Sequence, residues 1–495
     1  MSGTTRAWRA VIAGVLACVG ASGPAQAQQP EVITLAAAVR TALARNNRIV
    51  NERDTVEQAA LARHAATSLF RPKLVPNVQG SVGQTEASNQ TYRLDFLQRT
   101  TFGTEVRAGF GASSALIPSV TDPLGGDVRF YNADTNVTIV QPLMRGLGKS
   151  VARRALTSAE VRHQDAMVSL ARAEQLLAVE VASTYFRVIQ QRSLRDVAEK
   201  SLERSEQLLR VADAKMQAGL VSQLDVLRAR QLVAESRLQL GDATYAVDSA
   251  RDELATLMGW STDRAFEVVG DIPATDAPPS LEGAMATARE RRADLARARS
   301  SVSEAERTAG YFRNQLLPQV DLSVGLTRRE TATSLADSVR AGRFHLSTFF
   351  TISMPIDRTP QLVEYQNALI DRDRRRRDAD LLEQAVADEV KRYAREQRRL
   401  ADVLAAAEAS VDLARQEVEI AGFRYARGLS NSLDVISAET GLLAAEGRLV
   451  MVRAEAAVTR LRLRAVMGVL DPVMDFAGDS PRETTTLAMR TGGRP

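Results

Sequence analysis

The sequence predicts a mainly α-helical chain with a membrane-type β component, built from two copies of one unit. Three observations lead to this fold class: a turn motif that occurs twice, helical seams too long for a compact domain, and segments in which apolar and polar residues alternate. The chain has 495 residues, of which 45% are apolar and 25% are charged. That composition is typical of a globular protein.

The turn motif occurs at Gly219–Leu227 and again at Gly428–Ile436, an offset of 209 residues. Each copy starts with a glycine, which suits the left-handed position that ends a helix. A serine or asparagine then suits the next N-cap, and an aspartate three residues later suits the first turn of the following helix. Both copies therefore predict tight αα-hairpins. The turn residues are Gly219, Leu220, Ser222 and Asp225 in the first copy, and Gly428, Leu429, Asn431 and Asp434 in the second.

The remainder of the chain is duplicated as well. Phe70–Pro76 matches Phe312–Pro318, and Met258-Gly259 matches Met467-Gly468. The expected organisation is a signal peptide at 1–27, a first unit at 28–270, a Pro-containing linker at 271–280, a second unit at 281–470 and a flexible tail at 471–495. The first unit has strands within about 74–143 and a helical hairpin at 149–258 with its turn at 219–222; the second has strands within about 318–356 and a hairpin at 361–468 with its turn at 428–431.

The first 27 residues have the features of an export signal. Arg6 and Arg9 form a basic region, Val11–Cys18 is apolar, and Ala25–Ala27 is a small-x-small cleavage site. An alternative stays open, because the segment that ends at Cys18 resembles a lipoprotein cleavage box. Cys18 is the only cysteine, so cleavage after residue 27 leaves a mature chain without thiol chemistry.

The second long helix carries a seam in strict 4-3 alternation, which is typical of a coiled coil. From Gln361 to Arg427 it would span about 100 Å, whereas its hairpin partner, Ser432–Met467, covers only about 54 Å. A helix near 293–315 would stack end to end with that partner and cover most of the rest. Such a rod cannot bury itself, so we expect the seams to pack in a larger assembly. The seam positions are Val386, Val390, Tyr393, Gln397, Leu400, Leu404, Ala407, Val411, Ala414, Val418, Ala421 and Tyr425.

Alternating segments at 320–326 and 344–354, and at 78–85 and 135–143 in the first half, predict four strands. A further candidate lies at 104–111, inside a longer connection. The two segments of the second half approach the ~9–11 residues that a tilted membrane strand needs, although a soluble sheet with one wet face is the alternative. Four strands cannot close a barrel with room inside, and lipid does not tolerate open sheet edges. Several chains must therefore pool their strands; this reasoning does not fix the number of chains.

No catalytic, metal or cofactor site is predicted. His64, His163 and His345 lie in different elements without ligand spacing, and no phosphate-binding loop is present. The run Arg374–Arg377 is flanked by aspartates, which predicts a solvated face or inter-helix salt bridges. The net charge of +4 is too small to indicate a nucleic-acid partner.

The duplicated Phe-Arg-…-Leu-Pro block, Gln141–Gly148 and the two turns together resemble the TolC-like outer-membrane efflux protein (outer-membrane factor) family. The resemblance spans nearly all of 34–468. It implies a homotrimer in the outer membrane of a Gram-negative bacterium, with a twelve-stranded β-barrel and a coiled-coil helical barrel that crosses the periplasm. It also implies two partners: a periplasmic adaptor (membrane fusion) protein that docks at the turns, and an inner-membrane pump of the RND, ABC or MFS class.

The same resemblance implies a gate at the helical tip, closed by acidic residues and a tyrosine–arginine lock. Asp225, Asp434 and Tyr425 fall on the matching positions, as candidates for gating and cation selectivity. Both aspartates also suit a capping role, and Tyr425 also suits packing at the end of the seam. The sequence departs from the family at Ser430 and Ser437, where many relatives have an arginine and some an acidic residue.

Two functions from different classes follow. The first is a passive duct in an efflux or type I export system, without catalysis. The second is a periplasmic coiled-coil adaptor or scaffold without a pore. Two hairpins, each joined to alternating strands, favour the duct over the adaptor.

Overall fold

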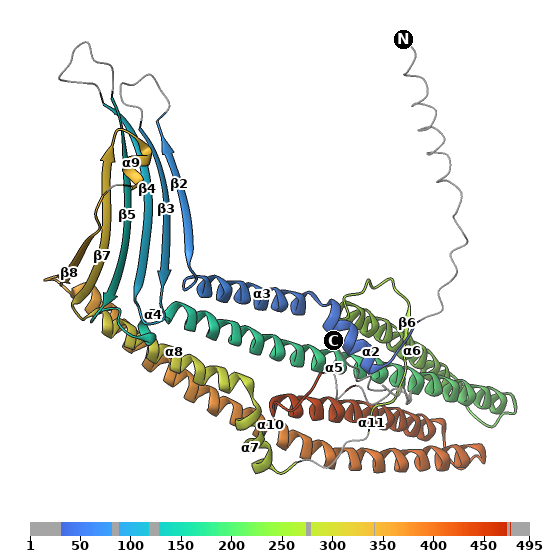
Figure 1. The fold of residues 1–495 in the computed structure, drawn as a ribbon. Coiled ribbons are helices and arrows are strands. Elements are labelled where there is room, and N and C mark those ends of the chain that lie inside the picture. Colours follow the sequence, from blue (N-terminus) through green and yellow to red (C-terminus); the bar gives the residue numbers. More distant parts are fainter. Residues whose placement is uncertain are drawn as a thin grey trace, which may run out of the picture.

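A computed structural model gives the fold of the chain (Figure 1). It describes residues 31–81, 89–117, 128–273, 279–340, 342–472 and 476. The expected signal peptide, Cys18 and nearly all of the expected tail lie outside the described residues. Within these ranges the chain forms one elongated body, with a β-sheet at one end and two helical hairpin tips at the other (Figure 1).

Two very long helices run along the body. They are α5 (Arg154–Gln217, 64 residues) and α10 (Thr359–Ala426, 68 residues), or about 96 and 102 Å at 1.5 Å per residue. Each turns back into a 35-residue helix, α6 (Gln223–Leu257) or α11 (Ser432–Val466). The shorter helices are α2 (Leu35–Arg45), α3 (Asn47–Ser68), α4 (Lys149–Ala152), α7 (Leu281–Arg291), α8 (Ala293–Gln315) and α9 (Leu335–Arg340).

The 4-3 seam of α10 is covered along its whole length. Of its twelve positions, none is exposed, and Val390, Leu400 and Val411 are almost completely buried. Helix α8 packs against the sheet-proximal part of α10, and α11 packs against the distal part (Figure 1). In the same way α3 and α6 pack against α5. Two short helices in line therefore cover each long one.

The sheet at the other end has six antiparallel strands in the order β2-β3-β4-β5-β7-β8 (Figure 1). The prediction of four strands per chain is therefore wrong. The candidate at 104–111 is a full strand, and the segment just before it forms another strand, which pairs with it. The strands are β2 (Lys73–Gly80), β3 (Asn89–Arg99), β4 (Glu105–Ile117), β5 (Val128–Pro142), β7 (Gln319–Ala332) and β8 (His345–Ser353).

Strand β3 was not predicted, because its segment was placed within the longer connection between strands. Arg93 and Asp95 alternate with Tyr92, Leu94 and Phe96, so the period of two is present. In the structure Arg93 Nε donates to Asp95 Oδ1 at 2.8 Å, and the two charges compensate each other on one face of the strand.

A second core lies midway along the body. Strands β1 (Glu31–Ile33) and β6 (Phe266–Val268) pair in parallel, and neither was predicted. The hydroxyl of Tyr185 on α5 donates to the carbonyl oxygens of Ile33 and Val269 at 3.1 and 2.6 Å. The N-terminal segment and the segment after α6 are thereby fixed to the long helix.

The two halves use the same joint between their paired short helices and the end of their hairpin. Asn46, the residue between α2 and α3, donates from Nδ2 to the carbonyl of Leu257 at 2.9 Å. Arg292, between α7 and α8, donates from Nη1 to the carbonyl of Val466 at 3.3 Å. The hairpins then end at a glycine with positive φ, Gly468 in the second half, where a Cβ would come within 3.0 Å of the Arg291 backbone.

Arg292 also anchors a buried ionic cluster in the second joint. Its side chain is 6% exposed and pairs with Asp294 and with Glu389 of α10, each at 2.7 Å. Burial works against the charged guanidinium, but hydrogen bonds to Asp294 and Glu389 outweigh it and raise the pKa of Arg292. The cluster therefore fixes α8 against α10 with its charges compensated.

Among the helices of the described residues, none has an apolar, weakly charged stretch of the length that a membrane crossing requires.

We predict that Arg292→Ala destabilises the protein by about 2–3 kcal/mol, because it leaves two partly buried carboxylates without their partner. The measurement is the melting temperature of the purified protein by circular dichroism, which should fall by several degrees. Arg289→Ala is the matched control: Arg289 pairs with Glu383 at 3.3 Å, but both side chains are about half exposed, so its loss should cost under about 1 kcal/mol. Equal losses in the two variants would contradict the assignment.

Candidate functional site: the hairpin tips

The two predicted turns lie together at the end of the body farthest from the sheet (Figure 1). Gly219 and Gly428 adopt φ of 71° and 76°, the left-handed conformation that glycine takes without a Cβ clash. Ser222 and Asn431 are the N-caps of α6 and α11, and each accepts the backbone N–H of the aspartate three residues later. The two turns therefore share one backbone design.

Asp225 ties the first turn to the second hairpin. Its backbone and side chain complete a capping box with Ser222, whose backbone N–H donates to Asp225 Oδ2 at 3.1 Å. Its other oxygen, Oδ1, accepts the hydroxyl of Ser432 at 2.7 Å, and Ser432 is completely buried. One carboxylate therefore caps its own helix and holds the neighbouring one.

The hydrogen bond from Ser432, followed by that from Ser222, holds the pKa of the Asp225 carboxyl below its usual value. A carboxyl whose pKa is depressed in the folded state stabilises the fold at pH values above its unfolded pKa of about 3.9. This contribution is lost as the pH falls through the lower, folded-state pKa. The contact between the hairpins should therefore persist at neutral and mildly acidic pH.

Asp434 differs from Asp225, although it occupies the same position in the second turn. Its backbone N–H donates to Asn431 Oδ1 at 3.1 Å, but the reciprocal side-chain bond of a capping box is missing. Within the described part of the chain, its carboxylate has no hydrogen-bond or ion-pair partner, and the residue is exposed. Asp434 is therefore the aspartate of the pair whose charge is directed to solvent.

Tyr425 lies at the end of the α10 seam, and its side chain is 3% exposed. The ammonium of Lys215 on α5 lies 4.2 Å from the centre of its ring and also donates to its backbone carbonyl. Burial, with a smaller contribution from the negative charge of Asp225, raises the pKa of the Tyr425 phenol, which stays protonated at neutral pH. The resemblance implied an arginine partner; the structure brings Lys215 of the same chain to this tyrosine.

The tips also share an apolar core to which all four hairpin helices contribute. Its buried members are Leu208, Ala212, Val226, Ala229, Ala421, Tyr425, Val435 and Ala438. Just behind it, Arg204 of α5 pairs with the nearly buried Glu439 of α11 at 2.6 Å. The two hairpins of one chain therefore form a single packed unit at the tip.

Leucines cover the outer surface of both turns. Leu220 and Leu429, at matching positions, are 72% and 66% exposed, and Leu224 and Leu433 are about half exposed. A small surface with several water-exposed apolar side chains is typical of a site that binds a protein partner.

Two contacts at the tip were missed in the sequence. Lys215 had a weak signal, since a basic residue in the last turn of a helix is commonly explained by the helix dipole alone. Ser432 had none, because its partner lies 207 residues away. The other predicted tip residues do come together, within one end of the molecule.

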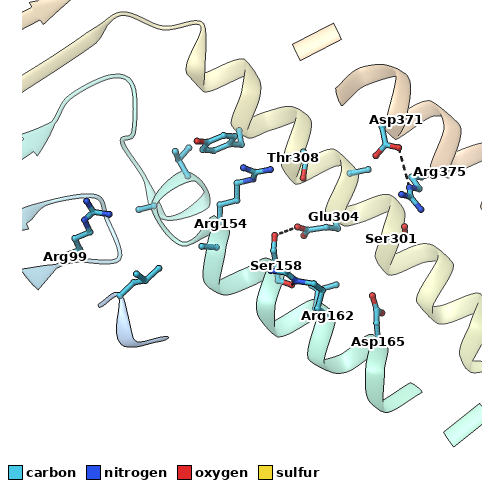
Figure 2. Close-up of a pocket in the computed structure, with 17 residues that line it drawn as sticks. Arg99, Arg154, Ser158, Arg162, Asp165, Ser301, Glu304, Thr308, Asp371 and Arg375 are labelled. Atoms are coloured by element: carbon cyan, nitrogen blue, oxygen red, sulfur yellow. Dashed lines mark hydrogen bonds and ion pairs between the residues drawn. The ribbon is translucent and has the colours of Figure 1, made fainter. Parts of the chain in front are cut away.

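An open polar hollow of about 690 Å³ lies near the sheet, among α5, α8 and α10 (Figure 2). Its charged groups largely pair with one another: Ser158 donates to Glu304, Arg375 lies 3.6 Å from Asp371, and Arg154 stacks over the ring of Tyr311 at 4.2 Å. The contacts of Ser158 with Glu304 and of Arg154 with Tyr311 join α5 to α8. Arg376, which belongs to the arginine run of α10, also joins two helices, because it pairs with Glu306 of α8.

The described residues contain no group of three or more His, Cys, Asp or Glu side chains that could hold a metal ion.

Comparison with known proteins gives one family. The family model described as "Outer membrane efflux protein" matches residues 132–260 and 284–469, more than half of the chain. A fusaric acid resistance protein, FusA of Burkholderia cepacia, is 29% identical over 266 residues, which cover 51% of this chain and 49% of that protein. The chain therefore spans about half the length of this relative.

Two matches that cover more of this chain agree with the assignment to this family. The probable efflux pump outer membrane protein SepC of Pseudomonas putida is 24% identical over 78% of this chain and 79% of its own length. A solved structure of the outer membrane protein VceC from Vibrio cholerae superposes with a TM-score of 0.66 at 17% identity, covering 88% of this chain and 96% of that one. At this identity the structural likeness shows the fold.

We predict that Asp225→Ala loosens both tips, whereas Asp434→Ala leaves them almost unchanged. Loss of a capping interaction costs about 1 kcal/mol, which corresponds to amide hydrogen exchange about fivefold faster in locally opened segments. Exchange mass spectrometry should show this acceleration at both 219–226 and 428–435 in Asp225→Ala. If only the first turn responded, the contact with Ser432 would not stabilise the second hairpin.

Proposed function

The chain belongs to the outer membrane efflux protein family, and on this basis we propose that it forms the outer-membrane duct of an efflux system in a Gram-negative bacterium. Proteins of this family are transport ducts, not enzymes. The observation that carries the proposal is the sheet, which has one apolar face and one polar face and adjoins a helical rod about 100 Å long.

The strand register separates two faces. One face carries exposed apolar side chains across the whole sheet: Leu74, Val78, Tyr92, Leu94, Phe110, Val137, Ile139, Leu326, Leu346, Phe350 and Ile352. The opposite face carries mainly polar groups, among them Arg93, Asp134, Thr138 and Ser347. A sheet in water would cover its apolar face with other elements, whereas lipid covers it in a transmembrane barrel.

The two unpaired edges of the sheet support a homo-oligomer, in which the sheets of several copies would join into a closed ring. Strands β2 and β8 are the edges of the sheet, and both are exposed over almost their whole length. Unpaired edges are not tolerated in lipid, so the β8 edge of one copy must pair with the β2 edge of the next. The even number of strands in each chain keeps this pairing antiparallel. Proteins of this family generally trimerise, and a homotrimer is the assembly that we propose.

The tips are the surface proposed to bind a periplasmic adaptor. Proteins of this family generally work with an adaptor and an inner-membrane pump. The exposed leucines of the two turns, Leu220 and Leu429 among them, supply an apolar contact surface on a rigid base. The pump of the RND, ABC or MFS class would then deliver the solute. The rival adaptor function does not account for a wide sheet with an uncovered apolar face.

We predict that Phe350→Lys blocks assembly in the outer membrane, whereas Phe349→Lys is tolerated. The two residues are neighbours on β8 and similarly exposed, at 66% and 60%, but they lie on opposite faces of the sheet. A lysine directed to lipid costs up to about 2–4 kcal/mol in each chain, with the full cost at the bilayer midplane. The amount of heat-modifiable trimer in detergent extracts of outer membranes measures the effect. Similar yields from both variants would exclude a lipid-facing surface on this side of β8.

We predict that Asp434→Ala weakens cation selectivity more than Asp225→Ala does. The double variant, in which alanine replaces both aspartates, should weaken it most. Carboxylates repeated around a narrow mouth favour cations, and only that of Asp434 is free of internal hydrogen bonds. Reversal potentials in planar bilayers under a salt gradient measure this. Selectivity unchanged in the double variant would leave both aspartates with the capping role alone.

The bilayer experiment also tests the function itself. The purified protein should form channels, and detergent should be needed to extract it from the outer membrane. A water-soluble monomer in periplasmic extract, without conductance, would support the adaptor or scaffold instead.

A further inference from the structure

The β3–β4 hairpin is an additional piece of the sheet. Four strands connect directly to helices at the sheet base: β2 follows α3, β5 leads into α4 and α5, β7 follows α8, and β8 leads into α10 (Figure 1). Strands β3 and β4 instead join each other there through a short turn at 100–104. The helical framework thus accounts for four strands, and the hairpin adds two between β2 and β5.

The hairpin turn is docked on the rest of the protein. The carbonyl of Phe102 accepts the N–H of Gly148 at 3.2 Å, and the ammonium of Lys149 lies 4.8 Å from the centre of the Phe102 ring. The hydroxyl of Thr104 lies 2.5 Å from Gln141 Oε1. The hairpin is therefore fixed to the base of the sheet by the loop that leads into α4.

The hairpin also continues both faces of the sheet. All eight residues of β2 pair with β3, and all thirteen residues of β4 pair with β5. On the apolar face, Leu94 and Phe110 are 46% and 42% exposed, like Ile139 of β5 at 44%. At 11 and 13 residues, β3 and β4 are long enough for a tilted crossing of a bilayer.

On the polar face the hairpin carries a charged cluster that crosses three strands. Besides its bond to Asp95, Arg93 reaches over β4 to Asn136 Oδ1 at 3.2 Å and lies 3.6 Å from Asp134 Oδ2, both on β5. The route passes over Gly109, where a Cβ would lie 2.5 Å from Asn136 Oδ1. A side chain on β4 would block this cluster, which is therefore built around the glycine.

From these observations we propose that the β3–β4 hairpin enlarges the membrane barrel of the assembled protein to eighteen strands and lines it with the Arg93 cluster. This proposal rests on the proposed trimeric duct, since three copies of a six-stranded sheet give eighteen strands. Barrel diameter grows roughly in proportion to strand number, so the barrel would be about 1.5 times as wide as a twelve-stranded one, with a wider lumen. The outer end of the duct would then admit bulkier solutes past a ring of three charged clusters.

Labelling of single cysteines tests whether the hairpin lies in the membrane wall. Thr91→Cys lies on the polar face of β3 and should react with a membrane-impermeant maleimide in intact outer membranes, whereas Leu94→Cys should react only after detergent is added. Ser323→Cys and Val324→Cys on β7 are the matched pair outside the hairpin, and the parent protein gives the background from Cys18. The two pairs should give the same pattern.

The outcomes separate the two proposals. If Leu94→Cys reacts as readily as Thr91→Cys while the β7 pair behaves as expected, the hairpin lies outside the barrel wall and the eighteen-stranded barrel is wrong. If the β7 pair also fails to discriminate, the membrane sheet and with it the proposed duct are wrong.

Electron cryomicroscopy of the full-length trimer counts the strands directly. Eighteen strands in the barrel wall would support the proposal, and twelve would overturn it. Deletion of residues 89–117 leaves β2 antiparallel to β5 with a connection at the outer end, and it should reduce the barrel diameter to about two thirds. An unchanged diameter in a folded deletion variant would also overturn it.

Discussion

The length of helices α5 and α10 is the constraint on which the rest of the architecture depends. Each is about 100 Å long and has to be covered on its packed side, yet no single returning helix is long enough. The chain meets this demand by placing two shorter helices in line along each long one, and the joint between them becomes a critical point. Asn46 and Arg292 occupy that joint and bond to the last carbonyl of the hairpin helix, at Leu257 and Val466. Both halves of the chain therefore solve the same packing problem in the same way. The joint between the short helices holds a neutral side chain in the first half and a buried ionic cluster in the second.

Much of this could be predicted from the sequence because it depends on local or periodic signals. The seam from Val386 to Tyr425 follows from its spacing alone, and Gly219 and Gly428 follow from backbone sterics. The relation between the halves follows from a constant offset between matching residues. These signals need no knowledge of which segments meet in space.

The parts that could not be predicted depend on pairing between distant residues. Arg93 looks unsuitable for a membrane strand until Asp95, Asp134 and Asn136 are seen around it and Gly109 is seen to leave room. Asp225 and Asp434 occupy the same position in the two turns, but only Asp225 completes a capping box and accepts the buried hydroxyl of Ser432. The strand count and the different hydrogen bonding of the two aspartates were therefore hidden for the same reason, since the deciding partner lies in another element.

The contacts between the hairpin tips have a mechanical consequence. Asp225 with Ser432, and Lys215 with Tyr425, fasten the two turns of one chain to each other. A mouth formed by three copies would therefore move as three rigid units, one for each chain, rather than as six independent turns. Any displacement of one turn would carry its companion with it, so the aperture would widen in three equal sectors, each bearing one solvent-directed carboxylate.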